Sequence, residues 1–141
     1  MINATLADVE IINSWRNEPE TLRLLSLRKK PFTKDETEDW LIDILIDEKQ
    51  TLYWVRNHDY RTLLVREVEK ESGSLLTIYF NAGHRIGAVR DCLELLTTDR
   101  KLLAETKVEN EVMQKILKKS GFTETGRTEK KGCELIQYRK N

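Results

Sequence analysis

Apolar positions near the start of the chain recur at the three-to-four-residue spacing of an amphipathic helix. Residues 2–6 predict a short strand, and Asp8 is placed to cap the helix that follows. The apolar face of this first helix consists of Val9, Ile12 and Trp15. The pattern therefore predicts a helix that packs one side against a core.

Two more helices are expected before residue 48. The segment 17–20 (NEPE) breaks the first helix, and Pro19 suits the first turn of a second one. Thr33 and Glu36 form a capping box at the start of a third helix over about residues 34–47. Its apolar face consists of Trp40, Leu41, Ile44 and Leu45.

After residue 50 the chain becomes rich in β-branched, aromatic and leucine residues, which favour strands. Residues 51–56 and 62–69 predict two strands joined by the polar turn 57–59. A second turn at 72–73 leads into a strand over 74–81, whose nearly continuous apolar run indicates cover on both faces. The short connections predict a three-stranded antiparallel meander.

The segment after the meander predicts a strand–helix–strand crossover. Residues 82–87 lead into a helix over about 88–97, and residues 101–107 form another strand. The inward face of the helix is expected to carry Val89, Cys92, Leu93 and Leu96. Because such a crossover joins parallel strands, strand 101–107 is expected to run parallel to strand 74–81.

The end of the chain predicts a helix and a hairpin. Asn110 caps the helix, which ends at Ser120 with Gly121 in the left-handed cap position. Residues 122–127 and 134–139 form the hairpin. The fold class is therefore α/β, more closely α+β: a mixed sheet with an antiparallel meander, a βαβ crossover, a helix and a C-terminal hairpin.

Composition favours a single domain over residues 1–141 and excludes several partners. Apolar residues make up 39% and charged residues 34% of the chain, the balance of a small globular domain. Lys plus Arg equals Asp plus Glu at 24 each, so no net charge attracts nucleic acid, and only the local basic clusters 28–30 and 127–131 remain as possible contact sites for it. No run approaches the roughly 20 apolar residues of a membrane span, and the N-terminus lacks an export-signal pattern. We expect a cytoplasmic protein without membrane association.

The two cysteines, Cys92 and Cys133, stand in no metal-binding spacing, so no metal is expected. Cys92 lies in the apolar crossover helix and Cys133 at the closing hairpin. Both are expected to be buried free thiols.

The order of elements resembles the GNAT family of N-acetyltransferases across essentially the whole chain. At the front, residues 14–20 (SWRNEPE), 31–33 (PFT) and 40–41 (WL) resemble the branch that acetylates protein N-termini and amino-sugars. At the back, residues 105–110 and 119–122 (KSGF) resemble that family's final strand, its Asn-started helix and its Gly-Phe ending. The resemblance implies direct transfer of acetyl from acetyl-CoA to an amine in a ternary complex.

The same resemblance places the acetyl-CoA pyrophosphate at the loop 83–88. Backbone N–H groups that converge at a helix start bind phosphate, and glycine lets the backbone approach closely. The loop is degenerate, because Ala82, Arg85 and Gly87 occupy the family's three characteristic places. Arg85 could instead pair with phosphate through its side chain.

The strand before this loop is expected to bond the pantetheine amides through its backbone, and Asn110 is expected to contact the cosubstrate in addition to capping its helix. The full set of expected cosubstrate-binding residues is Thr77, Ile78, Tyr79, Gly83, His84, Arg85, Ile86, Gly87, Ala88 and Asn110.

Acetyl transfer needs a base for the amine and a partner for the departing thiolate. Glu105 stands where a related N-terminal acetyltransferase type carries a glutamate base, although an outward-facing strand carboxylate also explains it. The family's tyrosine acid falls at Leu117 and is absent. Tyr79 could substitute, although core packing also explains a tyrosine there. A thiol with a pKa of about 8.5 can leave without a dedicated acid.

Trp15 and Arg16 come from the front half, where this branch builds its acceptor pocket. Trp15 is also explained by core packing, and Arg16 could anchor a carboxylate or phosphate of the acceptor. The expected acceptor is a small-molecule or peptide amine. The exposed edges of the final hairpin could pair two chains in a homodimer.

Two other functions fit the same residues. Arg85 in the loop and Leu117 in the acid's place favour a GNAT-like domain that has lost its chemistry and serves as a binding or regulatory module. A third interpretation is a small α/β protein that binds another phosphorylated ligand at the same turn.

Overall fold

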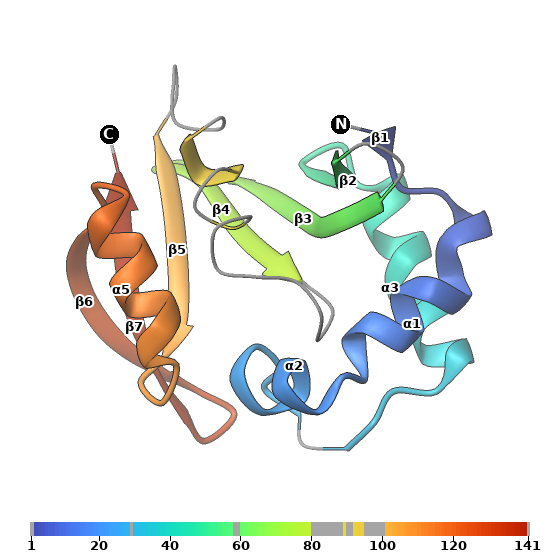
Figure 1. The fold of residues 1–141 in the computed structure, drawn as a ribbon, viewed down its shortest axis with the longest axis horizontal. Coiled ribbons are helices and arrows are strands. Elements are labelled where there is room, and N and C mark those ends of the chain that lie inside the picture. Colours follow the sequence, from blue (N-terminus) through green and yellow to red (C-terminus); the bar gives the residue numbers. More distant parts are fainter. Residues whose placement is uncertain are drawn as a thin grey trace.

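The protein is built on one mixed, seven-stranded sheet with the strand order β1-β2-β3-β4-β5-β7-β6 (Figure 1). The computed structural model describes residues 2–28, 30–57, 60–79, 89, 92–94 and 101–140. Neighbouring strands run antiparallel except β4 and β5, which are parallel. The strands are β1 (Ile2–Asn3), β2 (Gln50–Asn57), β3 (Tyr60–Lys70), β4 (Gly73–Tyr79), β5 (Leu102–Lys107), β6 (Thr123–Lys130) and β7 (Cys133–Lys140). The predicted meander, parallel pair and closing hairpin are confirmed.

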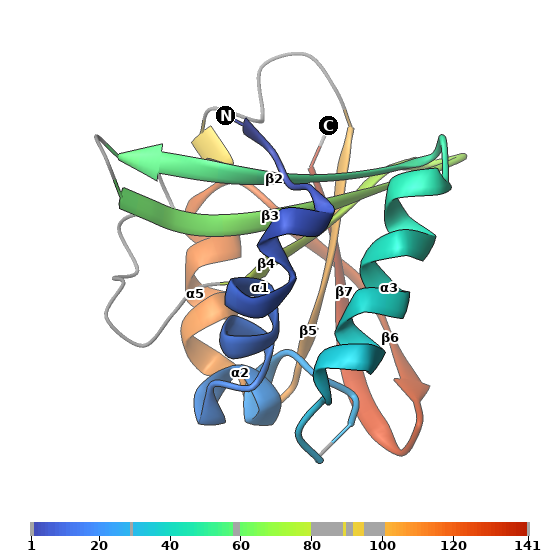
Figure 2. The ribbon, with the colours of Figure 1, turned by 90° about the vertical axis from the view of Figure 1, so that its right-hand side faces the viewer.

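Helices lie on both faces of this sheet (Figure 2). They are the 3-10 helix η1 (Leu6–Asp8) and the α-helices α1 (Val9–Arg16), α2 (Pro19–Leu24), α3 (Lys34–Ile46) and α5 (Glu111–Lys119). Figure 2 shows α1 and α3 in front of the sheet and α5 behind it. Residues 89 and 92–94 are also helical. Among the described helices, none is long and apolar enough to cross a membrane.

The start of the chain differs from the prediction. The expected strand 2–6 is only two residues long, because η1 begins at Leu6. Asp8 precedes α1 but makes no side-chain cap bond to it. Its Oδ2 instead accepts from the backbone N–H of Thr5 at 3.0 Å and from the indole Nε1 of Trp54 at 3.1 Å. Asp8 therefore fixes the N-terminal turn to the sheet.

The capping box of α3 is confirmed. The Oγ1 of Thr33 accepts from the N–H of Glu36 at 3.1 Å, and the Glu36 carboxylate accepts from the N–H of Thr33 at 3.0 Å. Two backbone donors that the helix itself cannot satisfy are thereby paired. This pairing holds the start of α3 beside the pocket described below.

Alternation along the strands produces two hydrophobic cores, one on each face of the sheet. On β3, Leu63 and Val65 face the core under α5, whereas Leu64 faces the core under α1 and α3. In the second core, Trp15 meets Trp54 edge-on, with ring centroids 5.1 Å apart. Both cores are buried to a few per cent exposure, which fixes the strand register because a one-residue slip would move every side chain of a strand to the opposite face.

The two thiols differ in exposure. Cys92 is buried as predicted, whereas Cys133 is only partly buried, because it is the first residue of β7, directly after the hairpin turn. Burial raises the pKa of Cys92 to about 11, and the nearby charge of Glu67 acts in the same direction. The Cys92 thiol is therefore protonated at neutral pH.

Gly73 determines how closely β4 approaches β5 at the start of their pairing. Its φ is +144°, and a Cβ atom there would lie 2.8 Å from the carbonyl oxygen of Lys101. The same carbonyl accepts from the N–H of Ser74 at 3.0 Å. Only glycine permits both the backbone angle and the approach, so Gly73 closes this end of the strand pair.

Replacing this glycine tests the constraint. Gly73→Ala is expected to lower the free energy of unfolding by about 1–3 kcal/mol, because the new methyl group meets backbone that cannot move away. Gly132→Ala is the matched control: its φ is +78°, but nothing lies within 4 Å of the added Cβ. In the control, the free energy of unfolding should fall only by the cost of the strained backbone angle, about 1 kcal/mol. Urea unfolding measures both, and equal losses would contradict a role for the close approach.

Candidate functional site

The parallel strands β4 and β5 pair over only part of their length. Pairing joins Ser74–Leu76 to residues 102–104 and stops there. Both strands continue, to Tyr79 and to Lys107, and they diverge toward α2 (Figure 1). The backbone edges of residues 77–79 and 105–107 therefore face each other without a shared ladder. We call this opening the fork.

The fork contains a narrow cavity of about 40 Å³. A single water needs roughly 10–15 Å³ by a comparable measure, so the cavity has room for only a few water-sized groups and a bulky group does not fit. The lining is apolar apart from Glu105 and two threonines. It consists of Leu25, Leu76, Thr77, Ile78, Leu93, Ala104, Glu105, Thr106, Met113 and Leu117.

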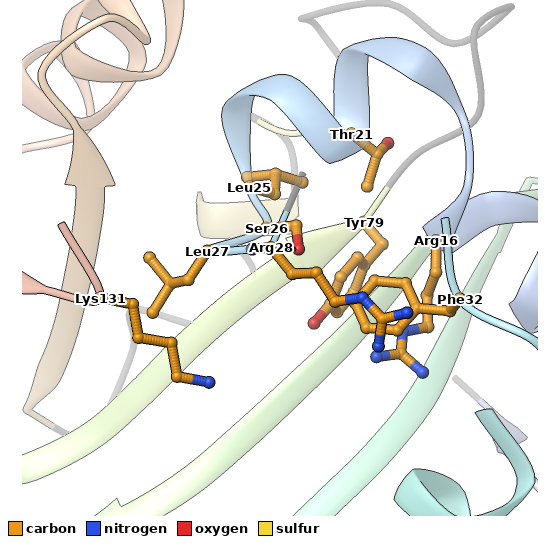
Figure 3. A pocket seen from close by; sticks show the side chains of 9 residues that line it. All are labelled: Arg16, Thr21, Leu25, Ser26, Leu27, Arg28, Phe32, Tyr79 and Lys131. Carbon is orange, nitrogen blue, oxygen red and sulfur yellow. Dashed lines mark hydrogen bonds between the residues drawn. The ribbon is translucent and has the colours of Figure 1, made fainter. Parts of the chain in front are cut away.

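A second, larger pocket of about 310 Å³ adjoins the fork. Leu25 lines both spaces, and Ile78 of the fork is followed directly by Tyr79 of the pocket. We call this space the α2 pocket. Figure 3 shows its lining residues, which are Arg16, Thr21, Leu25, Ser26, Leu27, Arg28, Phe32, Tyr79 and Lys131.

Arg16 lies at the end of α1 and is held by an aromatic stack. The centre of its guanidinium is 3.7 Å from the Phe32 ring centroid and 4.3 Å from that of Trp40. Its Nη1 donates to the Oγ1 of Thr37 at 3.1 Å. Burial lowers the pKa of Arg16, and the charges of Arg28 and Arg66 act in the same direction, although the group stays protonated at neutral pH.

The backbone of the aromatic loop is itself fixed. Asn17 donates through Nδ2 to the carbonyl oxygen of Phe32 at 2.8 Å, and its Oδ1 accepts from the Phe32 N–H at 2.7 Å. This two-bond clamp joins the end of α1 to the loop before α3. The segment 14–20 therefore positions Arg16 against Phe32 by direct contacts.

Tyr79, the last residue of β4, lies between Trp40 and the α2 pocket. Its ring meets that of Trp40 edge-on at 6.1 Å, and its hydroxyl points into the space that Arg28 and Lys131 also enter (Figure 3). Burial raises the pKa of Tyr79, opposed by the charges of Arg66 and Arg16. The hydroxyl is therefore protonated at neutral pH and can donate a hydrogen bond.

Glu105 lies on β5 at the fork, with 18% of its side chain exposed. Its carboxylate accepts from the Nζ of Lys130 at 3.0 and 3.3 Å and from the Nε2 of Gln137 at 3.4 Å. It does not line the α2 pocket. Glu105 thus lies where β4 and β5 separate, and its carboxylate is hydrogen-bonded to the closing hairpin.

The other predicted residues fall as follows. Asn110 caps α5, its Oδ1 accepting from the N–H of Met113 at 3.2 Å. Leu117 is buried and lines the fork, so an apolar group stands where the family's tyrosine is expected. Trp15 is buried in the core and does not line the α2 pocket. The expected phosphate loop, residues 83–88, lies outside the described residues.

Of the residues that line the α2 pocket, only Arg16 and Tyr79 were predicted as site residues. Arg28, Phe32 and Lys131 are among those that were not. Phe32 stood in a recognised segment, but nothing indicated its stacking on Arg16. Lys131 precedes Gly132 in a two-residue turn between β6 and β7, a pattern that marks a hairpin and not a pocket. In the described part of the chain, no cluster of three or more side chains could hold a metal ion.

Comparisons with known proteins relate this geometry to an enzyme fold. The sequence matches no protein-family model and no curated protein. Solved structures match over nearly the whole chain. One is RimL, a ribosomal L7/L12 alpha-N-protein acetyltransferase in complex with coenzyme A, with a TM-score of 0.80 and 12% identity over 99% of this chain and 91% of that chain.

Two further matches are acetyltransferases whose structures contain small amines. AAC(6')-Ib in complex with ribostamycin and coenzyme A has a TM-score of 0.79 and 16% identity, over 97% of this chain and 89% of that chain. Spermidine N-acetyltransferase from Vibrio cholerae in complex with CoA and spermine has a TM-score of 0.76 and 14% identity, over 97% and 91%. The chain therefore has the fold of the GNAT acetyltransferases, as predicted.

The pair that joins the α2 pocket to α3 gives a pH prediction. The two terminal nitrogens of the Arg28 guanidinium, Nη1 and Nη2, both donate to the Glu36 carboxylate, Nη2 at 3.0 Å. This pairing, with the N–H of Thr33, lowers the pKa of Glu36 from 4.5 to about 2. A lowered pKa stabilises the fold above the unfolded value of 4.5, and that contribution is lost as pH falls through about 2.

Glu36→Gln keeps a capping-box side chain but removes the charge. The wild type is expected to be more stable than this variant at pH 6, and the difference should disappear as the pH falls to about 2. Urea unfolding at several pH values measures it. A difference that stays constant with pH would show that the charge of Glu36 contributes nothing.

Proposed function

We propose that this protein is an acetyl-CoA-dependent N-acetyltransferase that transfers acetyl directly to an amine. The observation that carries the proposal is the fork between β4 and β5, which opens next to the α2 pocket. One opening can admit an extended arm and the other an acceptor. They meet at Leu25 and at the junction of Ile78 with Tyr79.

The fork has the properties that the pantetheine arm requires. Its cavity is narrow and mostly apolar, and the facing backbone edges can bond amides as another strand would. Residues 77–79 and Asn110 would hold the arm, and the loop 83–88 would hold the pyrophosphate. When bound, acetyl-CoA supplies an activated thioester carbonyl.

The chain's own groups would then move the protons. Glu105, whose carboxylate lines the fork, would accept the proton of the attacking amine, directly or through a water. Backbone N–H groups of β4 at the fork would polarise the thioester carbonyl. The neutral Tyr79 hydroxyl is the candidate donor to the leaving sulfur. Leu117 cannot take that role.

The neighbours support an amine acceptor. The matched structures are named as acting on a ribosomal protein or spermidine, or contain ribostamycin or spermine. At 12–16% identity these names establish only the fold for this chain, so the transfer rests on the fork and its adjoining pocket. The degenerate loop and Leu117 also fit a binding module that has lost its chemistry. The assay must distinguish this alternative from an active enzyme.

Two measurements test the proposed function together. Acetyl-CoA should raise the melting temperature of the protein in a concentration-dependent way, because a ligand that binds only the folded state stabilises it. Release of free CoA thiol should then appear with amines of a mixed panel. A melting temperature that acetyl-CoA leaves unchanged would refute the cosubstrate, and binding without thiol release would indicate the module.

Glu105→Gln tests the base. Turnover is expected to fall by a factor of about 10²–10⁴, while the Kd for acetyl-CoA stays the same, because the amide cannot accept the proton. Glu134→Gln, the same change at an exposed position of β7, is the matched control and should keep full turnover. Unchanged turnover in the Glu105 variant would remove it from the mechanism.

A further inference from the structure

Among the described residues that line the α2 pocket, every charged one is a cation: Arg16, Arg28 and Lys131. Tyr79 is neutral, and none of these described lining residues is a carboxylate. Cations held together repel one another and attract an anion into a partly desolvated space. The pocket therefore favours a negatively charged group, unless its charges are already neutralised by neighbours.

Only one of the three cations has such a partner. Arg28 is paired with Glu36 through both guanidinium nitrogens. Among the described residues, the only hydrogen-bond partner of Arg16 is the Thr37 hydroxyl, and no carboxylate lies within ion-pair distance of it. Arg16 is only 7% exposed. The Glu36 carboxylate acts on Arg16 only from beyond ion-pair distance and is itself paired with Arg28, so a bound anion would supply the direct partner that the buried guanidinium lacks.

Lys131 is the second cation of the pocket without an ion-pair partner among the described residues, and its backbone angle is an unfavourable one for lysine. It occupies a two-residue hairpin turn with φ +49°, the only described non-glycine residue with a positive φ. Gly132 beside it has φ +78°, and turns with two positive φ angles favour Asn-Gly or Gly-Gly. Lys131 forms no ion pair among the described residues, whereas its neighbour Lys130 pairs with Glu105. Figure 3 shows the Lys131 side chain extending across the pocket.

We propose that the acceptor amine carries a carboxylate or phosphate that binds between Arg16 and Lys131. This inference rests on the proposed function and adds the acceptor's chemical class. The pocket volume of about 310 Å³ is at the small end for ligand sites, which fits a compact amine or the end of a peptide. A polycation such as spermine, which one neighbour binds, would meet like charges here.

Matched acceptors test the class. The panel pairs glycine with glycinamide for the carboxylate and phosphoethanolamine with ethanolamine for the phosphate, with spermidine as the cationic arm. With saturating acetyl-CoA at constant ionic strength, kcat/KM for thiol release should be at least about tenfold higher for the anionic member of one pair. The better pair identifies the anion. Equal or higher values for the neutral members or spermidine would overturn the proposal.

A second readout does not depend on chemistry. Titration calorimetry with phosphoethanolamine and glycine against their neutral partners, with CoA present, measures acceptor binding directly. Tighter binding of an anionic member supports the inference even if turnover is absent. Equal Kd values for the anionic and neutral members would refute it. Failure of acetyl-CoA to shift the melting temperature would instead refute the proposed function, so the two failures are distinguishable.

Lys131→Asn links the preference to the residue. Asparagine is favoured at this turn position, so the variant should melt no lower than the wild type. Its preference for the anionic member should fall about two- to fivefold, because an exposed charge has been lost. Lys118→Gln makes the same charge change at an exposed position of α5 outside the pocket and should keep the full preference. Equal losses in both variants would exclude a specific role for Lys131.

Discussion

The structure depends on one interruption in an otherwise continuous backbone ladder. β4 and β5 bond at residues 74–76 and 102–104 and then separate, although both strands continue. Backbone N–H and C=O groups need partners wherever water is excluded. Under the proposed function, an extended, amide-bearing ligand would supply those partners in the fork. Gly73 closes one end by its contact with Lys101, and the open end faces α2 (Figure 1).

The two halves of the chain serve different sides of this opening. β4, β5 and α5 form a narrow space with a mostly apolar lining. The front helices and the final hairpin add a wider, charged pocket. Arg16 and Lys131 are far apart in sequence, yet both reach that pocket. Arg16 is held by aromatic rings, and among the described residues no carboxylate lies within ion-pair distance of it. Under the proposed function, its charge would help to select the acceptor while the fold stays the same.

Local patterns predicted the elements but not the contacts between them. The capping box at Thr33 and the Asn110 cap depend on residues three positions apart, so both could be recognised in the sequence. Trp15 and Arg16 are adjacent on a helix, so they point about 100° apart, one into the core and the other into the pocket. Asp8 binds Thr5 and the distant Trp54 and does not cap α1. The end of the β4–β5 ladder and the reach of Lys131 depend on packing between distant segments, which local periodicity does not contain.

Backbone hydrogen exchange tests the central claim most directly. The account holds that the arm of acetyl-CoA bonds to the strand edges in the fork. Adding acetyl-CoA should slow exchange at the amides of residues 77–79, while the amides of β6, at the far edge of the sheet, remain unchanged. Unaltered exchange at residues 77–79 in protein saturated with acetyl-CoA would show that the cosubstrate binds elsewhere.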